Sequence, residues 1–273
     1  MNEKPYRFTI GAFQLTVFKG GGGPSPLARI ASNATEAELA QIAAQEGIDP
    51  NAIEMSMNLV LIQTGQHTVL VDTGLPSSNL SAQLQAHGVP PESVDWVIIT
   101  HGHRDHIGGI LDADGDWQYP NARYAIATTE WEASMAQLAA ADDATLAALR
   151  VWQTLQQQQE RVMLIATDGQ AILPGISAMD APGHTVGHIA LMIESDGAQL
   201  LHLADAAHHY IQTLRPDWSP QFDADTTQSV PTRRRLFALA AQQQAQVLAY
   251  HFTFPGLGTI TQAGDALRWH AVK

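Results

Sequence analysis

One short stretch constrains this chain more than any other: an apolar run that ends in a cluster of metal-binding side chains. Residues 94–100 have the composition of a strand covered on both faces. Residues 101–106 follow directly and read His-Gly-His-Arg-Asp-His. A strand-to-helix turn lets such side chains fan out toward more than one ion, which one face of a short helix does not. Candidate ligands at this density predict a metal site rather than a solvated loop: His101, His103, Asp105 and His106.

The composition restricts both the ligands and the partners of that site. The 273 residues include no Cys, so a metal must bind nitrogen and oxygen atoms. A formal net charge of -13 disfavours nucleic acid and anionic membranes, because both need Lys and Arg as counter-charge. The expected partner is therefore a small molecule, neutral or locally apolar, and a homodimer is left open.

Hydropathy gives no sign of a membrane span or a secretion signal. No run approaches the roughly 18 apolar residues that a span requires. Residues 1–10 carry charges where a secretory signal needs an apolar core. We therefore expect a soluble, cytoplasmic protein.

Strand and helix patterns alternate in two similar halves, which predicts an α/β layered architecture in a single domain, residues 1–273. The glycines Gly20–Gly23 are expected to end the amino-terminal strands. A capped helix start at Thr35 indicates a helical excursion at about 24–52. An Ala-, Gln- and Leu-rich segment indicates a helical insertion at about 129–160, which is a candidate lid. Further helices are expected at 81–87 and 232–244, and strands at 8–10, 13–17, 58–62, 68–71, 94–100, 123–127, 162–166, 176–180, 189–193, 200–203 and 246–250.

The His-x-His-x-Asp-His string at 101–106 resembles the signature of the metallo-β-lactamase-fold hydrolases. The resemblance implies that family's fold, a four-layer αββα sandwich of two mixed β-sheets flanked by helices. In the family, the first two histidines bind one metal ion and the Asp-His pair binds the second.

Later segments resemble the family's remaining ligand positions in the same order. Residues 181–188, Ala-Pro-Gly-His-Thr-Val-Gly-His, resemble the segment whose first histidine completes the first metal's set. Residues 203–205 resemble the strand-end aspartate that bridges both ions, and residues 250–251 resemble the last histidine ligand. Residues 71–74 match an early aspartate, Asp72, that orients ligands. The resemblance covers residues from about 58 to 258 and implies these metal ligands: His101, His103, His184, Asp105, His106, Asp205 and His251.

This ligand set, five histidines and two carboxylates, suits two divalent ions, and zinc first. Manganese, iron and cobalt use the same ligand types. Two ions roughly 3.5–4 Å apart would lower the pKa of a bridging water from about 15.7 toward about 7, and the resulting hydroxide would be the nucleophile. Asp105 or Asp205 would then shuttle a proton, while Asp72 would orient a ligand.

The stretch from 216 to 258 resembles the branch that contains methyl parathion hydrolase and related lactonases. The resemblance implies opening of lactones or cleavage of related carboxylic esters. The first alternative is an organophosphate or phosphodiester hydrolase on the same metal centre. An iron-dependent oxidoreductase and a non-catalytic, metal-stabilised binding protein are further alternatives.

Several side chains near these motifs admit a role at the substrate or in the core. Arg233 is expected to form a structural ion pair with Asp223 or Asp225 rather than a substrate clamp. His188 is expected to be a nearby structural residue and His202 a hydrogen-bonded core residue. Candidates for the substrate pocket are His208, Phe222, Phe252 and Phe254, with His209 and Trp218 as weaker ones.

Overall fold

A computed structural model describes residues 3–264 and 266–272. Its first half forms a seven-stranded sheet in which the strands stand in chain order. The strands from β1 to β4 are antiparallel, and those from β4 to β7 are parallel. The strands are β1 (Tyr6–Ile10), β2 (Phe13–Ser25), β3 (Ile53–Gln63), β4 (Thr68–Val71), β5 (Trp96–Ile99), β6 (Arg123–Ala127) and β7 (Val162–Ile165).

The second half forms another seven-stranded sheet with the order β14-β13-β12-β11-β10-β9-β8. Only β11 and β12 are parallel among these strands, and the other neighbours are antiparallel. The strands are β8 (Asp168–Leu173), β9 (Ile176–Asp180), β10 (Ile189–Ser195), β11 (Ala198–His202), β12 (Gln246–Leu248), β13 (Leu257–Ala263) and β14 (Ala266–Ala271).

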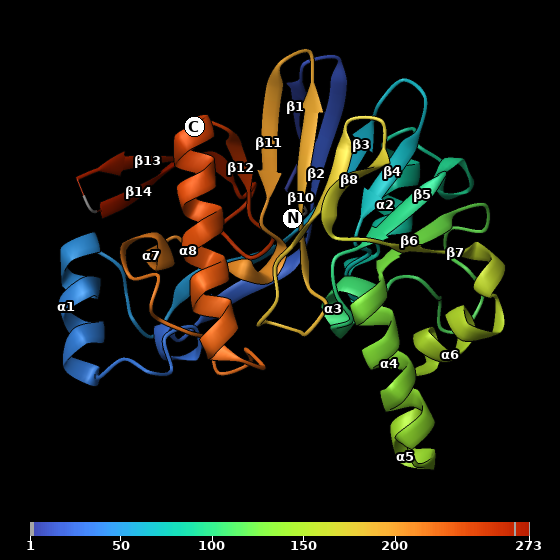
Figure 1. Ribbon diagram of the computed structural model, residues 1–273, viewed down its shortest axis with the longest axis horizontal. Helices are drawn as coiled ribbons and strands as arrows, with labels where there is room; N and C mark the ends of the chain where they lie inside the picture. The colour runs from blue at the N-terminus through green and yellow to red at the C-terminus, as the bar shows by residue number, and fades with distance from the viewer. Residues whose placement is uncertain (1–2, 265, 273) are drawn as a thin grey trace.

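The two sheets pack face to face because their strands carry apolar side chains on both faces. On β3, Val60 and Ile62 point into the core between the sheets, where they join Leu191 of β10. The alternate residues Leu59 and Leu61 point to the opposite face, as the two-residue period of a strand requires. Helices cover the outer face of each sheet, which confirms the predicted αββα sandwich (Figure 1).

Each outer layer is fixed by large side chains of its helices. Trp131 and Trp152 pack on the first sheet, and Leu236 and Phe237 pack on the second. The α-helices are α1 (Glu36–Glu46), α2 (Leu80–Ala86), α3 (Arg104–Ile107), α4 (Thr128–Ala140), α5 (Asp143–Leu146), α6 (Arg150–Gln157), α7 (Ile211–Leu214) and α8 (Thr226–Gln243). Short 3-10 helices are η1 (Leu27–Arg29), η2 (Pro76–Ser78), η3 (Pro91–Ser93), η4 (Gln159–Arg161) and η5 (Ala204–Ala206).

The two segments predicted as helical additions contain helices. The segment at about 24–52 holds η1 and α1, and α1 begins with the capping box that Thr35 and Glu38 form. The segment at about 129–160 holds α4, α5 and α6; α4 and α6 pack against the first sheet, whereas α5 projects away from it at the end of α4 (Figure 1). No helix in the described ranges is both long enough and apolar enough to span a membrane.

The glycines Gly20–Gly23 do not end the amino-terminal strand, so that expectation was wrong. Strand β2 continues through them to Ser25, and Gly22 pairs with Ser56 of β3 after a register shift. Ladder pairing uses main-chain groups, so the missing side chains do not prevent it. A Cβ at Gly22 would lie 2.2 Å from the carbonyl oxygen of Met55, so only glycine permits this close approach.

Candidate metal centre

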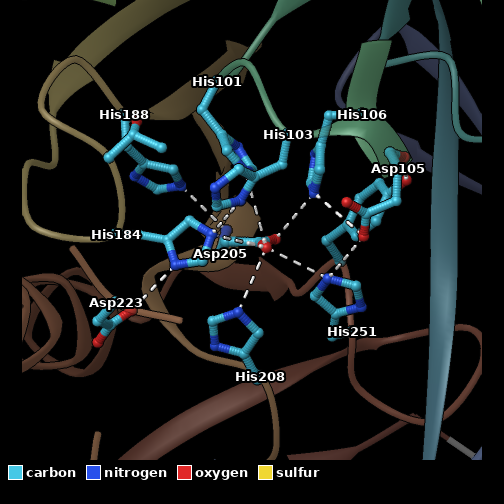
Figure 2. A network of polar contacts seen from close by, with 12 residues as sticks. His101, His103, Asp105, His106, His184, His188, Asp205, His208, Asp223 and His251 are labelled. Atoms are coloured by element: carbon cyan, nitrogen blue, oxygen red, sulfur yellow. Dashed lines mark hydrogen bonds and ion pairs between the residues drawn. The ribbon is translucent and has the colours of Figure 1, made fainter. Parts of the chain in front are cut away.

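The ends of two parallel strand pairs position the site. Asp72 follows β4 and His101 lies just past β5, its parallel neighbour in the first sheet. Asp205 follows β11 and His251 lies just past β12, its parallel neighbour in the second sheet. Parallel strands end at the same edge, so each pair delivers two polar side chains to one place. The two edges face each other, and their side chains converge (Figure 2).

Short connections supply the remaining predicted ligands. His103 lies in the loop after β5, and Asp105 and His106 lie on the single turn of α3. His184 lies in the loop between β9 and β10. The structure therefore brings together every side chain predicted as a ligand: His101, His103, His184, Asp105, His106, Asp205 and His251.

Asp205 lies at the centre of the cluster and is only 3% exposed. Its Oδ2 is 3.3 Å from His184 Nε2, 3.2 Å from His251 Nε2 and 3.8 Å from His101 Nε2. Its Oδ1 is 3.3 Å from His106 Nε2. The carboxylate thus faces imidazole nitrogens from both sheets, which is the arrangement expected of a residue shared by two ions (Figure 2).

The cluster divides into two ligand groups, each with potential ligand atoms within 4.8 Å of one another. The first group contains His101, His103, His184 and Asp205. The second group contains Asp105, His106 and His251. A third combination places His208 beside members of the other groups.

Several buried atoms of this cluster have no hydrogen-bond partner in the described part of the chain. A buried polar atom left unpaired costs roughly 1–3 kcal/mol. Several unpaired atoms at one place therefore indicate that a ligand binds there. Nitrogen and carboxylate oxygen are the atoms that zinc binds. The residues therefore fit divalent metal binding, and the unpaired atoms are His101 Nε2, His106 Nε2, Asp205 Oδ1, His208 Nδ1 and His208 Nε2.

Asp72 contacts the ring of His106 and the residue before His101, as expected of a residue that orients ligands. Its Oδ2 lies 2.7 Å from His106 Nδ1, which leaves Nε2 of that ring directed at the cluster. Its carboxylate also accepts hydrogen bonds from the N–H and hydroxyl groups of Thr100, at 2.9 and 2.7 Å. The backbone at Asp72 is left-handed (φ 59°), a conformation that Asp adopts more readily than most residues.

Asp223 orients His184, a role that the sequence did not reveal. Its Oδ1 lies 2.9 Å from His184 Nδ1, and its Oδ2 accepts hydrogen bonds from Ser229 and Arg233. The ion pair between Arg233 and Asp223, 3.2 Å long, is one of the two predicted alternatives and is fully buried. The remaining histidine ligand of the second group, His251, is oriented through Nδ1 by the main-chain oxygen of Ser56.

Charge balance within the cluster shifts several pKa values. Burial opposes the charged form of His184, but hydrogen bonds to Asp205 and Asp223 raise its pKa to about 9. Burial lowers the pKa of His103 to about 4, and the neighbouring His184 adds to this shift. Despite burial, the surrounding histidines hold the pKa of Asp205 well below its usual range. The site therefore keeps a buried carboxylate ionised, and protons and metal ions compete for the same ring nitrogens.

Two of the predicted pocket residues lie at the centre. His208 is buried, with Nε2 3.3 Å from Asp205 Oδ2, and its ring stacks on His251 with centroids 5.2 Å apart. Phe222 makes edge contacts with His184 and His208, at centroid distances of 5.9 and 4.8 Å. Both residues line the cavity that contains the cluster.

The other predicted pocket aromatics lie in the core. Phe252 is 2% exposed and packs edge-on against Trp269 beneath the second sheet. Phe254 packs on the core between the sheets, and Trp218 packs against η1 and α7. None of these three lines the two cavities at the centre. For Phe252 and Phe254, proximity to His251 in the sequence was misleading, because the chain turns into the core directly after His251.

The histidines predicted outside the ligand set have structural roles. His188 Nε2 accepts a hydrogen bond from the main-chain N–H of Asp205 at 3.0 Å. His202 is fully buried on β11 and accepts a hydrogen bond from the N–H of Ala204. His209 is also buried, and its ring contacts Tyr210.

Two cavities of similar volume, about 660 and 670 Å³, adjoin the centre. The first lies beneath α4 and α6 and is lined by Trp152 and Leu149. The second contains the ligands themselves and is bounded by Gly22 and Met57 of the first sheet. The cavities meet where both are lined by the same side chains: His103, Arg104, His184 and Phe222.

An αββα sandwich with a His/Asp cluster at the facing sheet edges defines the metallo-β-lactamase class. The profile of the Metallo-beta-lactamase superfamily matches residues 54–242, and the chain belongs to this superfamily.

Among sequence relatives, the N-acyl homoserine lactonase AttM of Azorhizobium caulinodans is 27% identical over 176 residues. That match covers 62% of this chain and 62% of AttM, which is less than two thirds of the relative. The N-acyl homoserine lactonase of Bacillus cereus is 22% identical over 226 residues, covering 74% of this chain and 83% of the relative.

Two solved structures share the fold over nearly the whole chain. The dizinc quorum-quenching lactonase AidC, determined with the product N-hexanoyl-L-homoserine, has a TM-score of 0.88 at 23% identity. The alignment covers 98% of this chain and 97% of AidC. The hydrolase AbOPH also has a TM-score of 0.88, at 24% identity, with 100% and 99% covered.

Proposed function

We propose that this protein is a dinuclear metal-dependent hydrolase that opens lactones or cleaves related carboxylic esters. The observation that carries the proposal is the position of Asp205 between two ligand groups, with five histidine Nε2 atoms within 3.8 Å of its carboxylate. The names of the lactonase relatives support the substrate class.

Two divalent ions in such a site would activate water near neutral pH and polarise the substrate's carbonyl oxygen. Asp205 would hold both ions, and the first and second ligand groups would hold one each. Zinc suits this set of nitrogen and oxygen ligands, and we propose it as the metal.

Asp105 is suited to proton transfer. Its side chain is 29% exposed, whereas that of Asp205 is 3% exposed, and it lines the second cavity. A carboxylate that borders both the ligands and the solvent-accessible cavity can accept a proton from the reacting centre and release it to water. We assign that step to Asp105 and the bridging role to Asp205.

His208 is suited to bind a substrate oxygen. It lines the second cavity, and its Nδ1 has no hydrogen-bond partner among the described residues, whereas its Nε2 lies 3.3 Å from Asp205 Oδ2. Burial lowers the pKa of His208 to about 4, although Asp205 opposes the shift, so the ring is neutral at pH 7. A neutral imidazole carries one N–H donor, which we assign to the carbonyl oxygen or leaving oxygen of the substrate.

The experiment is a parallel assay on protein whose metal content has been measured. N-hexanoyl and N-decanoyl homoserine lactones, a simple lactone and a phosphotriester are the substrates. We expect lactone opening with two equivalents of zinc, and loss of turnover in Asp205→Asn. Asp168→Asn, an exposed acid on β8, is the control and should be unaffected. Phosphotriester turnover without lactone opening would favour the organophosphate alternative, and stoichiometric iron would favour the oxidoreductase.

A further inference from the structure

We propose that Glu130, the third residue of α4, is a positioning residue that fixes the loops of the first ligand group and thereby sets that group's affinity for its ion. The proposal rests on the metal-binding role proposed above. Glu130 is a ligand of neither group, and no sequence motif marks it. It lies on the helical insertion, outside the segments that carry the ligands.

The carboxylate of Glu130 joins two loops that are far apart in the sequence. Oε1 accepts a hydrogen bond of 2.7 Å from the main-chain N–H of Gly102, which lies between His101 and His103. Oε2 accepts hydrogen bonds from the Thr185 hydroxyl at 2.7 Å and from the Gly187 N–H at 3.1 Å. Thr185 directly follows His184. One side chain thus contacts residues adjacent to all three histidines of the first group.

The packing around Glu130 leaves these loops little freedom. A Cβ at Gly187 would lie 2.1 Å from the Glu130 nitrogen, so this loop touches the backbone of α4. A Cβ at Gly102 would lie 2.8 Å from Trp152 Cζ2 and 3.1 Å from Glu130 Oε1. The glycines therefore let both loops press directly against the insertion, where small shifts of α4 would move the ligands.

The negative charge of Glu130 indicates that this residue supports cation binding and does not merely fill space. The residue is 5% exposed, and no Lys or Arg of the described ranges forms an ion pair with it. An unpaired buried carboxylate is costly, and a neutral side chain of the same shape would fill the space. Its three donors are hydrogen-bonding groups of the loops that carry His101, His103 and His184. A negative charge fixed at this position favours a cation held by those ligands.

The test compares Glu130→Ala and Glu130→Gln with Glu132→Gln, a matched control because Glu132 is exposed on the same helix. Zinc affinities are measured by chelator competition, and the geometry of the first site is followed by the absorption of Co²⁺-loaded protein. We expect Glu130→Ala to weaken one ion about 10–100-fold, the range typical for residues that orient metal ligands, and to leave the other unchanged. Glu130→Gln keeps the shape and loses the charge, so it should show a smaller loss.

Wild-type affinity for both ions in Glu130→Ala, with only a lower Tm, would overturn the proposal. If Glu130→Ala does not fold, Thr185→Val removes one of the three contacts and must still weaken the same ion. The metal readouts separate this proposal from the proposed reaction. A wild-type protein that binds two ions but opens no lactone would overturn the reaction alone, whereas one that binds no ion would overturn both.

Discussion

The two ligand groups of the centre differ in how firmly the protein holds them. In the first group, His101 is fully buried, His184 is 2% exposed with its ring fixed by Asp223, and His103 is partly exposed. In the second group, His106 is fully buried, but Asp105 is 29% exposed and His251 is 12% exposed, and these two line the second cavity. Asp105 is more exposed than the buried side chains of either group, and it belongs to the second group. We therefore propose that an ion in the first group would be retained more firmly, and that the second group would be more open to solvent.

The largest effect is expected where the two groups join. Asp205→Ala should remove the shared ligand, so both ions should be lost and turnover should fall by more than the roughly 100-fold typical of a residue that only orients a ligand. Metal content per protein and kcat/KM measure the two effects. Retention of one full equivalent of metal in this variant would show that the groups bind independently.

Asp223→Ala should affect the first group alone. It removes the partner of His184, so the affinity for one ion should fall about 10–100-fold. It also leaves Arg233 buried without its carboxylate, which should lower the free energy of unfolding by about 3–5 kcal/mol. Calorimetry and urea unfolding report the two changes.

Two further variants separate these effects. Asp223→Ala combined with Arg233→Met removes the unpaired charge and should recover part of the stability but not the ion affinity. The recovery is incomplete because Arg233 also donates hydrogen bonds to main-chain oxygens, among them that of Trp218. Asp225→Ala removes only the cap of α8, which should cost about 1 kcal/mol and leave metal binding unchanged. Equal weakening of both ions in Asp223→Ala would contradict the proposed difference between the two groups.

Removal of metal by a chelator should proceed in two phases. The partly exposed second group should release its ion first, because water and chelator reach Asp105 and His251 through the cavity. Stopped-flow detection with a chromogenic chelator resolves the phases. Asp105→Asn should accelerate the fast phase only, while Asp223→Ala should accelerate the slow one. A single phase in the wild-type protein would mean that the groups are equally labile.

The smallest expected effect is on the pH dependence of stability, and it comes from a buried histidine outside both groups. Burial lowers the pKa of His202 to about 4, so the unfolded chain binds this proton near pH 6.5 and the folded protein does not. Stability from this residue is therefore complete above pH 6.5 and is lost as the pH falls toward 4. Replacing the ring by Asn keeps the acceptor for Ala204 and removes the titration. Between pH 7 and 5.5, the free energy of unfolding measured with urea should fall by about 1 kcal/mol less in His202→Asn than in the wild-type protein.

The side chains that converge at the centre could be predicted because their signal is local in the sequence. His101, His103, Asp105 and His106 lie within one turn, and His184, Asp205 and His251 each sit in a short motif at a strand end. The αββα layering followed from the same resemblance and from strand patterns that the structure largely confirms. Strands β8, β13 and β14 were not expected, and their sequences are the more polar ones at the margin of the second sheet.

The residues that hold the ligands could not be predicted, because their contacts are distant in the chain. Glu130 meets Gly102 across 28 positions, and Asp223 meets His184 across 39. An isolated acidic residue on a helix or a loop usually faces solvent. The residues around Glu130 and Asp223 give no signal that these two side chains are buried. Phe252 and Phe254 show the converse error, since nearness to a ligand in the sequence did not place them in the cavity.

Each ligand group is complete only when both sheets are in place. His101 and His103 come from the first sheet and need His184 from the second, while His106 needs His251 in the same way. Neither half of the chain can therefore bind an ion tightly before the halves have docked, so metal binding is a late step of folding. A metal ion held by residues of both halves would have to be released, or one of its bonds broken, before the sheets separate. The metal content should accordingly govern the unfolding rate and the survival of the protein against proteases as well as its chemistry.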